Sequence, residues 1–437
     1  MRKIALLLLI LTYAANAQEA LTFADCLERT LKNNLQLKSA SFDEAIARSY
    51  HRGSYGEFLP TIDAEGEGRN SWGKELDPDT NTFTRDDLRN YEGTANAYFN
   101  LFSGLKVHND IKLARQEKEL VRTNIHLLQN QLTIDLAQRF ITILYLQEII
   151  AANEQQIQAS TKQLELAQLK FDSGVIPESE LFKIKAQKAT EEFTLLTNRN
   201  RLAENTISLK QLMNMPLETE VVLLKPNLEL NENLTASDNE LELTKKAVDI
   251  HPAFQASILE MKKARTELAI ARSLRWPTLS MRLMYRSNYD PMIRDQVSFD
   301  DQLDMNTSKQ IRFYLTIPIF NQFKNNLEIK AQKMLYRQSK VTTELERDRL
   351  SKEVLLAIND AKTSVKKNEA STIALEFSQK SYDADMLKFE VGKIGISELN
   401  LTKINYNSAQ AELIQSKYEL LFKNALIKFY AGEPFTL

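Results

Sequence analysis

Four short segments of the chain alternate between apolar and polar residues, at positions 59–70, 90–102, 276–287 and 309–319. Alternation with a period of two predicts β-strands that have one apolar and one polar face. Each segment is about ten residues long, which is the length of a tilted strand that spans an outer membrane in a β-barrel. A soluble antiparallel sheet with one face on a core would show the same pattern, and it stays open as an alternative.

Long stretches after the strand pairs carry apolar residues every three or four positions, as between Val121 and Ile143. This spacing predicts helices with one buried stripe, and we expect two long helices at 103–170 and 321–388. Each would be about 100 Å long at the α-helical rise per residue. Similar patterns predict shorter helices at 21–56, 178–214, 238–274 and 396–431. Two shorter helices end to end match one long helix, so each half of the chain is predicted to form a paired helical rod.

One stretch of the sequence occurs a second time in similar form. The segment "LKFDSGVIPESEL" at 169–181 returns as "LKFEVGKIGISEL" at 387–399, an offset of 218 with eight of thirteen positions identical. We therefore predict two copies of one unit, at 18–220 and 238–437. The joint between them, "NMPLETEVVLLKPNLELNENLTASDN", contains two Pro and five Asn, and its residues 221–237 are predicted to form a linker with a short strand.

The first residues, "MRKIALLLLILTYAANAQ", place Arg2 and Lys3 before an apolar run and an A-x-A pattern that ends at Ala17. This predicts a signal peptide over 1–17 and export of the chain, with a buried N-terminal helix as the alternative. The apolar run is too short to be a stable membrane helix. The single cysteine, Cys26, lies downstream of the cleavage position and is predicted to be a small core residue without a lipid.

The charge balance excludes several classes of function. The chain has 56 Lys and Arg against 58 Asp and Glu, for a net charge of −2, whereas a nucleic-acid binder usually carries a basic excess. Reactive groups do not converge on any catalytic or phosphate-binding motif. The histidines have no metal-ligand spacing; they are His51, His108, His126 and His251. We expect neither enzymatic activity nor a cofactor nor a metal.

Four strands are too few to close a barrel, for which about eight is the minimum. Because lipid does not accept open sheet edges, a membrane-spanning sheet of this kind must be completed by other copies of the chain. Two copies would give eight strands and a packed interior, and three would give twelve strands and a wider pore. Many charged residues fall on the predicted polar face, which favours a water-filled lumen and three copies; they are Asp63, Glu65, Glu67, Arg69, Glu92, Arg282, Arg286 and Arg312.

The ordered set of these features resembles the outer membrane efflux protein family, the TolC-like channels. It includes the opening "LTFADCLERTLKNNLQL", the duplicated strand pairs and turns, and the closing "LTKINYNSAQAELIQSKYELLFKNALIKFYAGE". The resemblance implies a homotrimer with a 12-stranded β-barrel in the outer membrane lipid and a 12-helix α-barrel in the periplasm. It also implies a passive exit duct for a tripartite efflux or type I secretion system, which a periplasmic adaptor protein joins to an inner-membrane transporter.

In that family the helix-turn-helix tips dock on the adaptor. Gly174 and Gly392 follow a helix end, where a glycine can take a positive φ, while Ser179 and Ser397 are placed to cap the returning helix. Apolar groups at an exposed tip need cover, which predicts a contact patch there. The predicted docking residues are Gly174, Ile176, Ser179, Glu180, Leu181, Gly392, Ile394, Ser397, Glu398 and Leu399. The alternative is a purely structural role, in which these residues only form a stable turn.

The resemblance also implies a periplasmic gate made of two acidic rings, three positions apart on the returning helix. Glu398 matches the first position, whereas Leu401 occupies the second. One acidic ring and one apolar ring are therefore expected, and an apolar constriction can close a pore by excluding water. The rival to a channel is a non-conducting periplasmic coiled-coil protein, which would account for the helices but not for four amphipathic strands.

Overall fold

The computed structural model describes residues 19–76, 81–84, 88–226, 240–291 and 296–437. The predicted signal peptide at 1–17 and most of the predicted linker at 221–237 lie outside the described residues. Within the described start of that linker, a short strand, β6, spans Val221–Leu223 and pairs in parallel with β1 at Glu19–Leu21.

The first half of the chain continues from β1 through helices, strands and helices again. Its elements are α2 (Phe23–Asn33), α3 (Leu35–Gly53), the 3₁₀ helix η1 (Ser54–Phe58), β2 (Thr61–Ser71), β3 (Glu75–Leu76), β4 (Phe83–Thr84), β5 (Leu88–Ser103), α4 (Lys106–Asp172) and α5 (Glu178–Leu212). The second half has the same plan. Its elements are α6 (Glu240–Ile250), α7 (Pro252–Ser273), β7 (Thr278–Tyr289), α8 (Phe299–Met305), β8 (Ser308–Thr316), α9 (Lys324–Glu390) and α10 (Ile396–Tyr430).

The two halves match in element length as well as in order. Helices α4 and α9 have 67 residues each, and α5 and α10 have 35 each. Long helices of this kind keep their length only if packing covers their apolar stripe, because isolated helices are marginal in water. The equal lengths show that the two copies share one plan of helices.

Two helices that the sequence pattern predicts as continuous are each broken once, so the predictions at 21–56 and 238–274 were wrong in this respect. The breaks fall at Asn34 and His251, and a side chain caps the following helix at both. Asn34 Oδ1 accepts hydrogen bonds from the backbone N–H groups of Gln36 (2.9 Å) and Leu37 (3.3 Å). His251 Nδ1 accepts one from the N–H of Ala253 at 3.2 Å. Each cap satisfies backbone donors that a new helix start leaves without partners.

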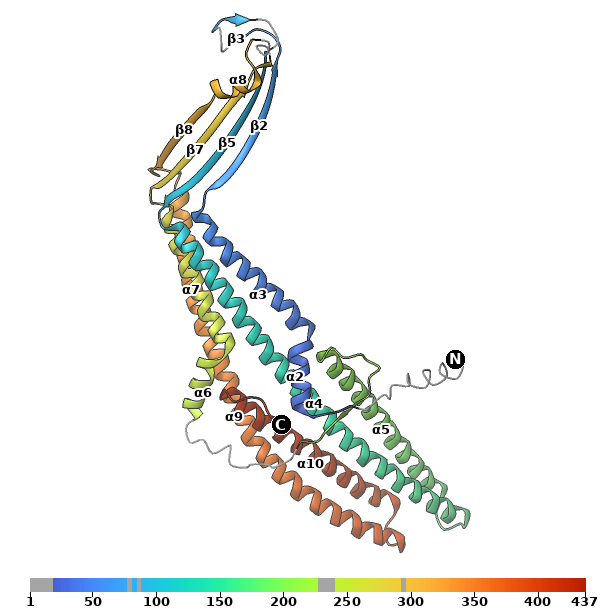
Figure 1. The fold of residues 1–437 in the computed structure, drawn as a ribbon. Coiled ribbons are helices and arrows are strands. Elements are labelled where there is room, and N and C mark those ends of the chain that lie inside the picture. The colour runs from blue at the N-terminus through green and yellow to red at the C-terminus, as the bar shows by residue number, and fades with distance from the viewer. Residues whose placement is uncertain (1–18, 77–80, 85–87, 227–239, 292–295) are drawn as a thin grey trace, which may run out of the picture. The chain divides into compact units, whose positions relative to one another are not determined.

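Four strands form one antiparallel sheet in the order β2-β5-β7-β8, which Figure 1 shows side by side. The sheet is built from one strand pair of each copy, joined at the β5–β7 contact. Its register places like faces together, as in the row Ile62, Ala97, Leu283 and Ile311. Strands β2 and β8 are the two edges of this sheet.

The chain divides into two compact units that cut across the sequence copies. One unit holds the described residues of 19–41, 123–255 and 345–437, and the other holds those of 42–122 and 256–344. The second unit contains the four-stranded sheet. Each unit takes segments from both copies, so neither copy forms a compact unit alone.

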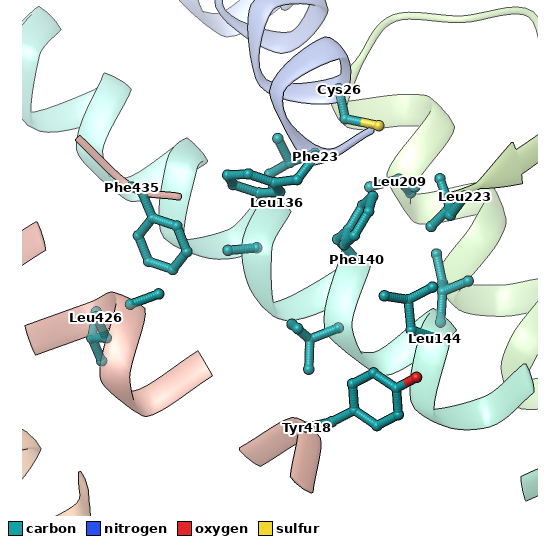
Figure 2. Packing of buried hydrophobic residues seen from close by; sticks show 14 of the residues in the cluster. Phe23, Cys26, Leu136, Phe140, Leu144, Leu209, Leu223, Tyr418, Leu426 and Phe435 are labelled. Atoms are coloured by element: carbon teal, nitrogen blue, oxygen red, sulfur yellow. The ribbon is translucent and has the colours of Figure 1, made fainter. Parts of the chain in front are cut away.

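The core of the first unit lies where α2, α4, α5 and α10 meet (Figure 2). Phe23 contacts Phe140 edge to face and also Phe435, with ring centroids 5.6 Å apart in both pairs. Cys26 is fully buried in this cluster, which confirms the prediction of a core residue. Burial of each large apolar side chain contributes about 1.5–3 kcal/mol. The core therefore packs α2 and the C-terminal parts of α5 and α10 against the middle of α4.

None of the described helices combines the length and the apolar character that a membrane-spanning helix requires.

Candidate functional site: a two-faced sheet and paired helical tips

The polar face of the sheet carries a connected set of hydrogen bonds. Asn96, which is 2% exposed, donates from Nδ2 to Asp63 Oδ1 at 2.9 Å. Its Oδ1 accepts from the Nε and Nη2 atoms of Arg282 at 3.1 and 2.7 Å. The Arg282 guanidinium also lies 5.0 Å from the ring centroid of Tyr98. Strands β2, β5 and β7 are thus tied together by side chains on this face as well as by their backbones.

Further up the same face, Arg286 forms an ion pair with Glu92 at 2.8 Å, and Thr94 donates to the same carboxylate at 3.1 Å. Arg312 donates to Gln310 on β8. Exposed pairs of this kind contribute at most about 1 kcal/mol each. Their main consequence is that the charges of this face are held against the sheet.

The strand register places all eight charged residues predicted for the lumen on this one face. The structure adds a feature that the sequence analysis missed. The acidic members, Asp63, Glu65, Glu67 and Glu92, lie on β2 and β5, whereas three of the four arginines lie on β7 and β8. Among these eight residues, the strand pair β2–β5 is therefore mainly negative and the pair β7–β8 is positive. The eight charges together sum to zero. Only the pairing of strands, and not the alternation within one strand, reveals this division.

The opposite face of the sheet is apolar and exposed. Ile62 is 74% exposed, and Ile311, Phe313 and Leu315 are 64–67% exposed. A soluble sheet on its own core would bury these side chains, which carry most of the free energy of burial. Among the described residues only α8, at one end of β7, packs on this face and leaves these side chains exposed, so a soluble sheet that buries its apolar face on its own core does not describe it.

The two helix-turn-helix tips have the same backbone structure. Gly174 has φ 72° and Gly392 has φ 74°. In the first tip, the N–H of Val175 donates to the carbonyl of Lys170 and that of Gly174 to Phe171. The equivalent bonds close the second tip. This is the Schellman arrangement of a helix C-terminus, in which glycine accepts the positive φ without strain.

The serines do not cap the returning helices, so that prediction was wrong. Pro177 and Gly395 occupy the N-cap positions, and neither has a side chain that could cap. Ser179 and Ser397 are the second residues of α5 and α10, two positions after the N-cap. Ser397 Oγ instead accepts a hydrogen bond from Lys183 Nζ at 2.9 Å, which links the two tips.

The prediction that the apolar residues of the turns are exposed was also wrong. Leu181 is 3% exposed and Leu399 is fully buried, while Ile176 and Ile394 are partly buried. The two tips pack on each other, and all four helices contribute to one small apolar cluster; its buried members are Ala167, Leu181, Ile184, Ile396 and Leu399. Each turn alone would expose these side chains, which is why its sequence suggested a contact patch.

A buried ion pair lies further along the same four helices. Lys403 Nζ on α10 is 2.9 Å from Glu191 Oε1 on α5, and the two side chains are 3% and 4% exposed. Ser160 on α4 donates to Glu191 and accepts from Lys403, and Gln187 donates to Glu191 at 3.0 Å. Burial alone would raise the pKa of the Glu191 carboxyl, but these hydrogen bonds outweigh burial and hold the pKa below its usual value. The sequence analysis did not find this pair, because no local pattern joins its residues.

The two predicted gate residues lie one helical turn apart near the start of α10. Glu398 and Leu401 are both exposed, the latter by 60%. Exposure leaves both side chains available to line an opening. Among the described residues, no group of three His, Cys, Asp or Glu side chains is close enough to hold a metal ion.

An exposed apolar sheet and duplicated long helices are the features of a protein with one part in a membrane and another in water. The model of the family described as "Outer membrane efflux protein" matches residues 26–215 and 243–433 of the chain. The protein belongs to the outer membrane efflux protein family. It is accordingly a protein of the outer membrane that extends into the periplasm and takes part in transport.

Solved structures show the same fold. CusC, described for its conformational changes on folding and channel formation, has a TM-score of 0.80 at 15% identity, over 97% of this chain and 96% of CusC. The CmeC outer membrane channel of Campylobacter jejuni has a TM-score of 0.79 at 14% identity, with coverages of 95% and 87%. The open-state MtrE channel of Neisseria gonorrhoeae has a TM-score of 0.73 at 15% identity, with coverages of 94% and 88%. No curated protein matches the chain.

Proposed function

We propose that three copies of this chain form a 12-stranded β-barrel continuous with a 12-helix periplasmic α-barrel, and that the assembly is a passive exit duct. The observation that carries the proposal is the four-stranded sheet with an exposed apolar face and two open edges, β2 and β8. Lipid can accept such a face only if the edges are paired, which requires further strands from other copies. Twelve strands leave room for a pore, whereas eight would fill with side chains.

The polar face would line the pore. Asp63, Glu92, Arg282 and Arg286 are held in hydrogen bonds and ion pairs, and the charges of the eight predicted lumen residues sum to zero. A lining of this kind keeps water in the pore without a strong preference for cations or anions. The duct would therefore carry whatever an inner-membrane transporter delivers through a periplasmic adaptor, in tripartite efflux or in type I secretion. The transporter supplies the energy.

We propose that the paired tips dock on the adaptor. Because Leu181 and Leu399 are buried, the docking surface must consist of the groups that stay exposed around Gly174 and Gly392. These include the side chains of Val175 and Val391, each 69% exposed. The twofold repetition of the tip would offer each adaptor ring two similar surfaces per subunit.

We propose further that Glu398 and Leu401 form the periplasmic gate. Opening would move the start of α10 away from α4 and α5, against the apolar cluster and the Lys403–Glu191 pair that join them. Adaptor binding would favour this open arrangement as a population shift. A channel that rests closed needs such a contact, since the open state must be the minor one without a partner.

The assembly is tested by disulfide crosslinking across the proposed seam. In a background with Cys26→Ala, we expect Asp63→Cys on β2 combined in turn with Gln310→Cys or Arg312→Cys on β8 to give covalent trimers in outer membranes. A matched pair on central strands, Asn96→Cys with Met284→Cys, should crosslink only within one chain, since these residues are opposite each other. A soluble periplasmic monomer without seam crosslinks or conductance in planar bilayers would favour the non-conducting coiled-coil alternative.

The gate is tested at the acidic residue that the two tips have at equivalent positions, Glu180 in the first and Glu398 in the second. Glu398→Gln removes one negative charge per subunit at the proposed constriction, and we expect higher leak conductance in planar bilayers. Glu180→Gln, at the equivalent position of the first tip, should leave the conductance unchanged. Equal conductance of the natural protein and Glu398→Gln would contradict the gating role of Glu398.

A further inference from the structure

The apolar face of the sheet contains a groove. Two adjoining depressions of about 590 and 490 Å³ share Ala95 and Tyr285, so that together they follow the face across all four strands. Each falls within the size range of ligand-binding pockets. Both are open depressions in the surface of the sheet, not enclosed cavities.

Small residues form the floor of the groove and aromatic residues form its walls. The floor is made by Ala64, Gly93, Ala95 and Ala97 of β2 and β5. The walls of the first depression are Tyr91, Tyr285, Tyr289 and Phe299. Small residues beside large ones on one face create a lasting recess, because the sheet backbone between them cannot collapse to fill it.

Helix α8 closes one side of the groove. Ser287 Oγ on β7 donates to the carbonyl of Leu303 at 2.7 Å, and the rings of Tyr289 and Phe299 are in edge contact at 5.0 Å. Tyr289 also stacks on Tyr91 at 6.4 Å. These contacts fix α8 on the apolar face at the end of β7 that is farther from α7. In a membrane barrel, aromatic side chains at this end lie at the level of the lipid headgroups.

A single lysine stands at the second depression. Lys309 on β8 lies opposite Tyr285, and its Nζ is 5.9 Å from the centroid of that ring. It is the one charged side chain among the outward-facing positions that line the groove. A cation beside an apolar recess complements an amphiphile that has an acyl chain and a negative headgroup.

We propose that this groove binds one acyl chain of an anionic membrane lipid, with the lipid phosphate at Lys309. The proposal rests on the part of the proposed function that turns the apolar face toward lipid. The groove is continuous with that face, so an annular lipid can enter it sideways without leaving the membrane. The headgroup would then lie between the aromatic walls of the first depression, and the acyl chain would run from Lys309 along the second depression past Ala97, Leu283 and Ile311.

Gly93 allows the groove to be filled without disturbing the sheet. A Cβ added at Gly93 would meet no atom within 4 Å, and Gly66, directly opposite on β2, is equally free but does not line the groove. Gly93→Ile therefore fills the recess, and Gly66→Ile adds the same group beside it. Ala95→Leu is a second way to fill it.

The experiment measures lipid retained by the detergent-purified trimer with native mass spectrometry, after addition of dimyristoyl phosphatidylglycerol or dimyristoyl phosphatidylcholine. We expect the natural protein to retain phosphatidylglycerol preferentially. Gly93→Ile and Ala95→Leu should lower retention about tenfold, equivalent to about 1.4 kcal/mol, while Gly66→Ile should not. Lys309→Gln should reduce phosphatidylglycerol to the level of phosphatidylcholine.

Unchanged lipid retention in Gly93→Ile and Ala95→Leu would contradict lipid binding in the groove. Equal retention of the two lipids by the natural protein would contradict the role of Lys309. Conductance in planar bilayers, measured on the same preparations, separates this proposal from the channel. A natural trimer that conducts but retains no phosphatidylglycerol refutes the groove alone. A chain that neither forms trimers nor conducts refutes both.

Discussion

The two helical tips share a turn but differ in what they contact. Both have a glycine with positive φ and the same closing hydrogen bonds. At the position where the second tip has the fully buried Ile396, the first tip has the exposed Glu178. Lys403 is buried on α10, whereas its counterpart Lys185 on α5 is exposed.

This difference distinguishes residues that form the turn from residues that join the two copies. The residues common to both tips define the backbone of the turn, which each copy needs for itself. Residues that differ, such as Ile396 and Lys403, add contacts between the copies to those of shared residues such as Leu181 and Leu399. The Lys403–Glu191 pair takes one residue from each copy. The contact between the tips therefore depends on residues that differ between the two copies as well as on shared ones.

The largest effect is expected from the buried pair. Lys403→Met leaves the Glu191 carboxylate buried without its cation, which costs about 3–5 kcal/mol. Hydrogen exchange should show this loss as easier opening of the first turns of α10, and leak conductance should rise. Lys185→Met, the matched change in the other copy, should stay within about 0.5 kcal/mol.

The double variant Lys403→Met with Glu191→Met sharpens this test. It removes both charges and keeps side chains of similar length, so most of the lost stability should return. If the double variant is as unstable as Lys403→Met alone, the pairing of the two charges is not what joins the copies.

The next effect concerns the apolar cluster. Ile396→Ala removes a fully buried side chain and should destabilise the tip by about 2–5 kcal/mol. The equivalent change in the first copy, Glu178→Ala, alters an exposed residue and should have little effect. Urea unfolding followed by hydrogen exchange in α5 and α10 would measure both. Similar losses in the two variants would show that the tips do not differ as described.

The glycines should behave alike in both tips, because there the copies are the same. Gly174→Val and Gly392→Val each place a β-branched residue at positive φ, at an expected cost of about 1–2 kcal/mol. The comparison predicts similar melting-point shifts and weaker crosslinking to the adaptor in both variants. A clear difference between the two variants would mean that the two turns differ in structure despite their similar sequences.

The sequence predicted the elements well where the signal is local. Strand alternation and helical spacing gave the strands and long helices to within a few residues, and Gly174 and Gly392 predicted their turns. The break at His251 was missed although Pro252, a common first residue of a helix, marks it. The burial of Leu181 and Leu399 and the Lys403–Glu191 pair could not be predicted, because they depend on how two distant turns pack.

The smallest effect is expected at the two helix breaks, at Asn34 and His251. Asn34 caps its helix with an amide oxygen that does not titrate, whereas His251 caps with Nδ1, which can accept a hydrogen bond only while it is unprotonated. Burial lowers the pKa of His251, with Glu353 and Glu346 acting to raise it and Arg349 to lower it. The unfolded chain, with an ordinary His pKa of about 6.5, therefore takes up this proton at higher pH than the folded chain. Stability should be full above that pH and should fall as the pH drops toward the folded pKa.

His251→Asn provides the same cap that Asn34 provides in the first copy, without titration. We expect it to match the natural protein at pH 8 and to be more stable at pH 5, by about 1 kcal/mol, the usual contribution of a helix cap. Thermal unfolding at the two pH values measures the difference, and Asn34→Ala serves as a variant that loses a cap at both. If the natural protein and His251→Asn lose stability in parallel between pH 8 and pH 5, the acid sensitivity arises elsewhere. The two breaks would then be equivalent in energy as well as in position.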